Sequence, residues 1–314
     1  MVFRDYIISP LASDSALSDC QSTGKLMKIE KPYSTLPHVD SFIEWLAAQL
    51  DAKAQLDHGY LDRRTGAVWT CSNLHDAYAA YSWNHPGNKR LAYNPGSSSS
   101  SNDNALEALR ADLIAAGNND AKMLQAMMDV MAWGGVSARN GSWLQKNQVG
   151  LAVMVNTVAA ALAKNDPNSP TLASKALRFN SGMTKVYSLL CENFVIYDSR
   201  VAAALGMLVV RYCRTKGLDY VPSALNFPWA AAKESAMTAS PKCRNPSTGT
   251  FQFSRLRSGS HHARWNMHAS WVLSQAVKHR LSSNSPFRKN KTSAQALRDL
   301  EKALFSIGYD LGKF

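Results

Sequence analysis

The chain has 314 residues, of which 46% are hydrophobic and 18% charged. This composition excludes an intrinsically disordered protein, and the length allows a substantial core in one large domain or two ordinary ones. Lys and Arg number 35 against 23 Asp and Glu, which gives a formal net charge of +12. The best candidate for a membrane span, 201–210, covers only about half a bilayer, so we expect no transmembrane helix.

Cysteine usage and the N-terminal sequence bear on the compartment. The first residues show no basic segment followed by an apolar stretch, so we expect no secretory signal. The five cysteines are odd in number and have no metal-ligand spacing. Because the chain also has no P-loop or dinucleotide fingerprint, we expect no metal and no cofactor. A reducing, cytoplasmic compartment fits best.

The N-terminal region, 1–100, is predicted to be mostly helical, because its apolar residues recur at helical spacing. One amphipathic pattern places Phe42, Trp45 and Leu46 on a single face. A Ser- and Asn-rich stretch at 96–104 predicts a loop, and with it a domain boundary near residue 100. The predicted helices here are 39–56 and 74–83, and the predicted strands are 2–8 and 65–71.

The second region, 101–314, is predicted to be mostly helical with loops. Asp103 or Asn104 is a candidate N-cap for the first helix, and the Gly134-Gly135 pair is a natural stop for the second. The segment 150–164 is apolar nearly all round, which is typical of a buried central helix. The predicted helices are 105–116, 120–132, 150–164, 171–179, 184–191, 199–212, 222–233, 261–281 and 293–311.

The positive charge is concentrated in one basic segment, 235–298, which contains no acidic residue. It holds eleven Lys and Arg residues, and so +11 of the net +12, together with four of the eight histidines. A block of one sign repels itself unless an opposite charge binds it. A phosphate backbone is the simplest partner, because each bound cation releases a counterion. A solvated surface that serves solubility and an anionic membrane are the alternatives.

Chemistry is indicated by the stretch 171–213. It predicts a helix, a tight turn at Gly182, a second helix, a short extended link and a third helix. The backbone N–H groups at the start of the second helix are expected to point outward, where they suit a phosphate oxygen. Lys185 lies in the first turn of that helix and is a candidate nucleophile. Asp198 caps the third helix and is expected to stay ionised.

Two motifs in this stretch carry a resemblance. They are Thr184-Lys185-Val186 and Ile196-Tyr197-Asp198-Ser199-Arg200-Val201. With the preceding hairpin, they resemble the helix-hairpin-helix DNA glycosylase superfamily, in particular its 8-oxoguanine DNA glycosylase-like branch. The resemblance implies a mainly α fold of two helical subdomains with a cleft between them and few or no strands. The hairpin would span 171–192, and the basic segment would belong to the same glycosylase-like region, 101–314.

The resemblance also implies roles for residues. Lys185 and Asp198 take the positions of the catalytic lysine and aspartate, and the turn residues Ser181, Gly182, Met183 and Thr184 would contact the DNA backbone. A nucleotide is turned out of the duplex into a pocket. Asp198 stabilises positive charge on the sugar, and either Lys185 or water attacks C1′. We expect a monomer that binds double-stranded DNA carrying a modified base and associates with the nucleoid.

Candidates for the base pocket are less distinctive, and each has a structural alternative. Trp133 could stack on an extruded base or belong to the core. Phe253 could supply a stacking ring or pack on the core, and Tyr197 could line the pocket floor or be buried. Arg264 and His268 lie off the apolar face of helix 261–281 and could face DNA or a base.

The sequence leaves the excised base open among 8-oxoguanine, an alkylated purine and a glucosylated hydroxymethylcytosine. The core combined with a diverged N-terminal half is similar to prokaryotic anti-phage DNA glycosylases, which favours a bulky viral modification such as glucosylated hydroxymethylcytosine. An 8-oxoguanine-type repair glycosylase with lyase activity is the first alternative. A helix-hairpin-helix protein that binds DNA without cleaving any bond is the second.

Overall fold

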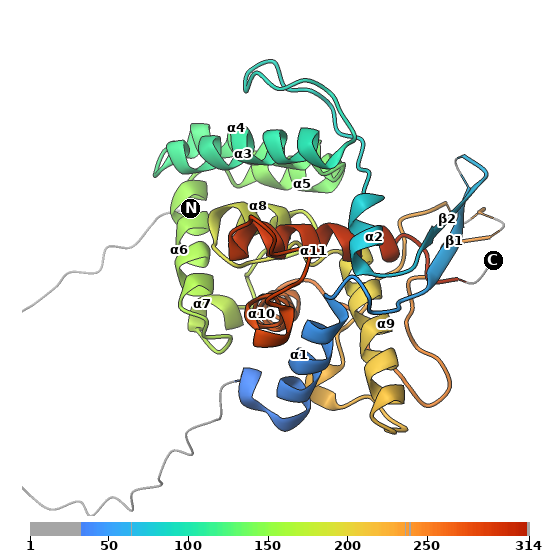
Figure 1. Ribbon diagram of the computed structural model, residues 1–314. Coiled ribbons are helices and arrows are strands. Elements are labelled where there is room, and N and C mark those ends of the chain that lie inside the picture. The colour runs from blue at the N-terminus through green and yellow to red at the C-terminus, as the bar shows by residue number, and fades with distance from the viewer. Residues whose placement is uncertain (1–32, 64, 236, 239, 313–314) are drawn as a thin grey trace, which may run out of the picture. The chain divides into compact units, whose positions relative to one another are not determined.

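The computed structural model describes residues 33–312, except 64, 236 and 239. This part of the chain is mainly helical, with eleven α-helices and one two-stranded antiparallel sheet (Figure 1). The mainly α class predicted from the sequence is therefore confirmed. The predicted strand 2–8 lies outside the described residues.

Two apolar clusters form the core, and they are built from different helices. The first cluster buries the inner faces of α1 (Pro37–Gln49), α2 (Leu74–Ala79), α9 (Ser199–Thr215), α10 (Ser260–Lys278) and α11 (Ser293–Ile307). The second cluster is formed by α3 (Ser99–Ala116), α4 (Asp120–Trp133), α5 (Ser137–Lys146), α6 (Leu151–Ala163) and α8 (Met183–Leu190). In Figure 1, α3, α4 and α5 lie together above α8 and α11, with α1 and α9 below.

Residues 33–100 belong to the same compact unit as the rest of the described chain. Helix α2 packs on α11, and α1 packs on α10. Strands β1 (His58–Asp62) and β2 (Ala67–Cys71) pair with His58 opposite Cys71, which confirms the strand predicted at 65–71. The predicted domain boundary near residue 100 is wrong, because the helices before it complete the core of the helices at the C-terminal end.

The Ser/Asn-rich stretch 96–104 is not a loop, because α3 begins inside it at Ser99. The Ser98 side chain caps the helix by accepting a hydrogen bond from the Ser101 amide, so neither Asp103 nor Asn104 is the cap. Asn102 is fully buried and donates to the carbonyl oxygens of Trp83 and Ser98 at 2.9 and 3.0 Å. Side-chain hydrogen bonds to the backbone thus recruit a polar segment into a helix.

Other predicted elements differ in extent. Helix α6 is a surface helix, with Val153 61% exposed, and not a buried central one. The segment 222–233 forms only a 3₁₀ turn at Ser223–Leu225, because proline residues bound it on both sides. The first helix ends at Gln49 instead of residue 56. Over the described part of the chain, no helix combines the length and apolar character needed to cross a bilayer.

The C-terminal end of α11 lies directly on the first turn of α9. A Cβ atom added at Gly308 would stand 1.8 Å from the carbonyl oxygen of Arg200. Only a glycine therefore allows this approach. The contact fixes α11 against the segment that carries Asp198.

Candidate active site

The predicted hairpin differs from a helix-turn-helix. Its first helix, α7 (Pro170–Ala173), has four residues, and the chain is irregular from there to Gly182. Gly182 has φ −79°, so the turn does not need a glycine's conformational freedom. A Cβ atom there would lie 2.3 Å from Nδ2 of Asn140. The glycine is required because Asn140 packs against the backbone.

The amides of this turn are not open to a ligand. The N–H groups of Gly182 and Met183 donate to Oδ1 of Asn180 at 2.8 and 3.1 Å, and the Thr184 amide donates to the Asn180 carbonyl. Met183 and Thr184 are also buried. The expectation of outward-pointing amides at Gly182, Met183 and Thr184 is therefore wrong, since Asn180 satisfies them. Of the four turn residues, only Ser181 lines the cavity described below.

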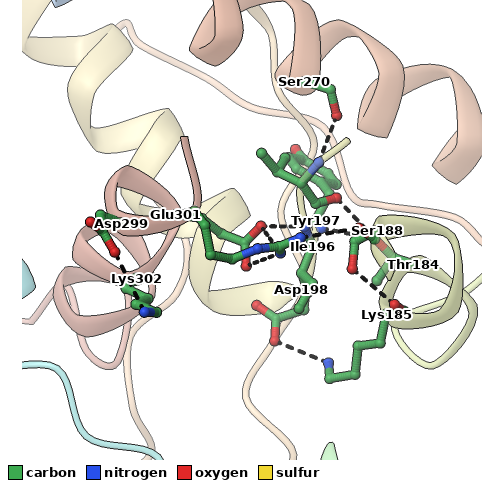
Figure 2. A network of polar contacts seen from close by, with 12 residues as sticks. Thr184, Lys185, Ser188, Ile196, Tyr197, Asp198, Ser270, Asp299, Glu301 and Lys302 are labelled. Carbon is green, nitrogen blue, oxygen red and sulfur yellow. Dashed lines mark hydrogen bonds and ion pairs between the residues drawn. The ribbon is translucent and has the colours of Figure 1, made fainter. Parts of the chain in front are cut away.

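The link that leads to Asp198 is held by side chains from three helices, α8, α10 and α11 (Figure 2). Five of its backbone groups are hydrogen-bonded this way, at 2.7–3.1 Å. The partners are Ser270 and Asn266 for Val195, Glu301 for Ile196, and Thr184 and His262 for Tyr197. These contacts replace the neighbours that a sheet strand would have, so the position of Asp198 is fixed by the core.

Asp198 is the N-cap of α9, as predicted. Its Oδ1 atom accepts hydrogen bonds from the amides of Arg200 (2.9 Å) and Val201 (3.3 Å). Its Oδ2 atom lies 3.5 Å from Nζ of Lys185. Burial acts to raise the pKa of Asp198, but the charges of Lys185, Arg244 and Arg200 outweigh it and hold the pKa below its usual value. The carboxylate is therefore ionised.

Lys185 is 5% exposed and reaches Asp198 along the C-terminal end of α4. A Cβ atom at Gly134 would stand 2.5 Å from Cδ of Lys185, so the glycine leaves room for the lysine stem. The ammonium group also donates to the Ser181 carbonyl at 3.1 Å. The structure thus brings together the amine and the carboxylate that the sequence motif singled out (Figure 2).

Both groups line a cavity of about 390 Å³. Small-molecule sites have volumes of about 300–1,000 Å³. Four aromatic residues contribute to its wall, namely Tyr81, Trp83, Trp133 and Phe305. The Trp83 indole donates to the Trp133 carbonyl at 3.0 Å, and the Trp133 indole donates to Asn102 at 3.1 Å. A flat apolar ligand would therefore meet fixed rings beside the ion pair.

The cavity is strongly positive. Among the described residues, six cationic side chains line it against two carboxylates, Asp198 and Glu301. The cations are Lys185, Arg200, Lys233, Arg244, Arg298 and Lys302. Only Arg244 and Arg298 come from the basic segment, whose other charges lie elsewhere. The sequence did not single out the contributions of Lys302 and Glu301, because their positions in α11 carry no motif.

Of the predicted pocket residues, only Trp133 lines the cavity. Tyr197 is fully buried, and its hydroxyl donates to a backbone carbonyl at 2.8 Å. Phe253 packs into the first apolar cluster. Arg264 is exposed on α10, and His268 stacks on Tyr33 with ring centroids 3.8 Å apart. These four residues therefore have structural or surface positions away from the cavity.

Among residues 33–312 where described, no three His, Cys, Asp or Glu side chains are grouped to hold a metal ion. Comparison with known proteins gives no match, whether to a protein-family model, to a curated protein or to a solved structure. The geometry of the cavity is therefore the basis for assigning a function.

Proposed function

We propose that the protein is a DNA glycosylase that turns a modified nucleotide out of duplex DNA and cleaves its N-glycosidic bond. One observation carries the proposal: an amine and an ionised carboxylate lie 3.5 Å apart on the wall of an aromatic-lined cavity. A merely structural ion pair has no need of a cavity of about 390 Å³ beside it. The sequence motif around both residues supports the same function.

The chemistry follows from the two groups. As the bond between C1′ and the base breaks, the base leaves with the bonding electrons and the sugar becomes positive. Asp198 stabilises that charge, because it is an anion whose position is fixed by the hydrogen-bonded link 195–197. Lys185 loses a proton to solvent and, as a free amine, adds to C1′ while the departing base takes up a proton. The added nitrogen then loses a second proton, the C1′–O4′ bond breaks with a proton going to O4′, and the nitrogen forms a Schiff base with C1′ of the opened sugar. If water attacks instead, the product is an intact abasic site.

The substrate proposal is a bulky modified base, such as glucosylated hydroxymethylcytosine in phage DNA, and the role is defence against such phage. The fixed rings of Trp83 and Trp133 suit a base plane. An 8-oxoguanine-type repair glycosylase is the alternative. Mass spectrometry of the bases released from modified phage DNA and from host DNA distinguishes the two enzymes. A defence glycosylase should release a free modified base from the phage DNA, and a repair glycosylase from the host DNA.

Borohydride trapping tests the role of Lys185. We expect the protein to form a covalent adduct with duplex DNA that contains the modified base, and Lys185→Ala to form none. Lys122→Ala, which removes an exposed lysine on α4, is the matched control and should trap normally. Base release without any adduct from the parent protein would assign the attack to water.

Asp198→Asn tests the carboxylate separately. The amide keeps the shape of the side chain and an oxygen for capping α9, but it removes the charge. We expect the rate of base release to fall by roughly a hundredfold or more. Release at the parental rate would contradict the proposed function.

A DNA-binding protein without catalytic activity is the second candidate. Exposed cations of the basic segment favour it, including Arg255, Arg257 and Arg264. This function predicts salt-sensitive binding to duplex DNA and no released base from any substrate. It leaves the Lys185–Asp198 pair without a role beyond packing.

A further inference from the structure

Two arginines beside Asp198, Arg200 and Arg244, line the cavity, and both contact Tyr309. The guanidinium of Arg200 lies over the rings of Phe305 and Tyr309, 4.1 and 4.8 Å from their centroids. Arg244 donates to the Ser199 hydroxyl and, at 3.5 Å, to the Tyr309 carbonyl. Ring stacking and hydrogen bonds therefore hold both planar groups in place at the cavity wall.

Three other cations of the cavity have anionic partners. Lys185 pairs with Asp198, Arg298 pairs with Glu301, and Lys302 pairs with Asp103 and Asp299. Within the part of the chain that the structure describes, neither Arg200 nor Arg244 forms an ion pair with a carboxylate. Lys233, at the exposed edge of the cavity, adds a third such charge. These three cations therefore give the cavity an excess of positive charge.

This excess is costly without a ligand. Burial and the nearby charge of Arg244 lower the pKa of Arg200 to about 10, and burial also lowers the pKa of Arg244. Each guanidinium is thus destabilised as a cation in its site. A bound anion would offset both the desolvation and the mutual repulsion.

We propose that Arg200 and Arg244 form a phosphate-binding subsite, which holds one phosphodiester of the nucleotide whose sugar lies against Asp198. Guanidinium groups match phosphate oxygens with paired hydrogen bonds. Arg200 follows Asp198 by two residues in the first turn of α9, so the phosphate and the sugar carbon of one nucleotide can be bound together. This inference rests on the proposed function and adds the recognition of the backbone at the reacting nucleotide.

Inorganic phosphate tests the subsite without any DNA. We expect millimolar phosphate to raise the melting temperature of the parent protein above that in chloride of equal ionic strength. Arg200→Met keeps a stem to pack on Phe305 but removes the charge, and should abolish the shift. Arg139→Gln, at an exposed position on α5 outside both the cavity and the basic segment, is the matched control and should keep it. If Arg200→Met does not fold, Arg200→Lys should weaken the shift, because it keeps the charge and loses the fork.

Duplexes with one uncharged methylphosphonate linkage locate the phosphate. An abasic-site analogue in the duplex marks the extruded nucleotide. We expect neutralising one linkage beside it to weaken binding by roughly tenfold for the parent and for Arg139→Gln. For Arg200→Met the same change should have almost no effect, because the partner charge is already gone.

The outcomes separate this inference from the proposed function. A linkage effect that persists unchanged in Arg200→Met overturns the subsite, even if bases are released normally. A phosphate-induced shift without a linkage effect overturns the assignment to DNA and points to a free phosphate-bearing ligand. If the linkage effect is lost in Arg200→Met but no base is ever released, the subsite stands and the glycosylase activity falls.

Discussion

Two lysines are buried in the same cavity, and they are held very differently. Lys302 donates to Ser99, Asp103 and Asp299, with the first two at 2.7–2.8 Å. Lys185 has one carboxylate, at 3.5 Å, and one backbone carbonyl. Lys302 is surrounded by close acceptors and is therefore a structural tie between α3 and α11. A side chain with one loosely placed carboxylate can move toward a ligand, which is what a nucleophile requires.

The largest expected effect concerns stability and would test this comparison directly. Lys302→Met leaves Asp299 buried with fewer partners, so we expect the free energy of unfolding to fall by about 3 kcal/mol. Lys185→Met should cost about 1 kcal/mol or less, because two amides and two arginines still stabilise Asp198. Urea denaturation of both variants measures the difference. Equal losses would contradict the distinction between a tie and a nucleophile.

The second prediction concerns His262, which contacts the Tyr197 carbonyl and so helps to fix the Asp198 carboxylate near Lys185. Burial lowers the pKa of His262 from 6.5 to about 4. Below pH 6.5 the unfolded chain binds a proton that the folded protein does not bind until about pH 4. The free energy of unfolding therefore decreases as the pH is lowered through that window. Between pH 7 and pH 5 the parent should lose about 2 kcal/mol more than His262→Gln. Denaturation curves at the two pH values measure this, and parallel losses would show that His262 does not titrate as a buried group.

The smallest expected effect concerns the path of the Lys185 stem. Gly134→Ala adds a methyl group 2.5 Å from Cδ of Lys185 and displaces a flexible side chain. We expect borohydride trapping to slow by roughly tenfold, because a misplaced amine misses C1′, while the melting temperature changes little. Gly141→Ala is the control, since its nearest neighbour is the flexible end of Met128 at 3.2 Å. Normal trapping by Gly134→Ala would place the active amine elsewhere.

The sequence could predict the ion pair but not the cavity around it. Asp198 as a cap and Lys185 in a first turn follow from local patterns, and both are found. Trp83 and Phe305 line the cavity through contacts between segments more than 200 residues apart, which no local pattern encodes. From the sequence, Tyr197 is a candidate only because it precedes Asp198, and successive residues of an extended link point to opposite sides.

Local sequence patterns mispredict helix boundaries where tertiary contacts override composition. The serine run before residue 104 looks like a linker, yet the Ser98 cap and buried Asn102 make it helical. The apolar segment 150–164 looks like a central helix, yet one face of α6 is exposed. In both cases the outcome depends on which partners the fold supplies, and apolar content alone cannot specify them.

The position of the Asp198 carboxylate depends on several side chains at once, because together they hold the link 195–197. Four side chains from α8, α10 and α11 each form a hydrogen bond with a backbone atom within three residues of Asp198. They are Thr184, His262, Ser270 and Glu301. A substitution at any of these four positions would displace the Asp198 carboxylate while leaving Asp198 itself in the sequence. A random mutational screen for lost activity should therefore find hits scattered over three helices that converge on a single side chain in space.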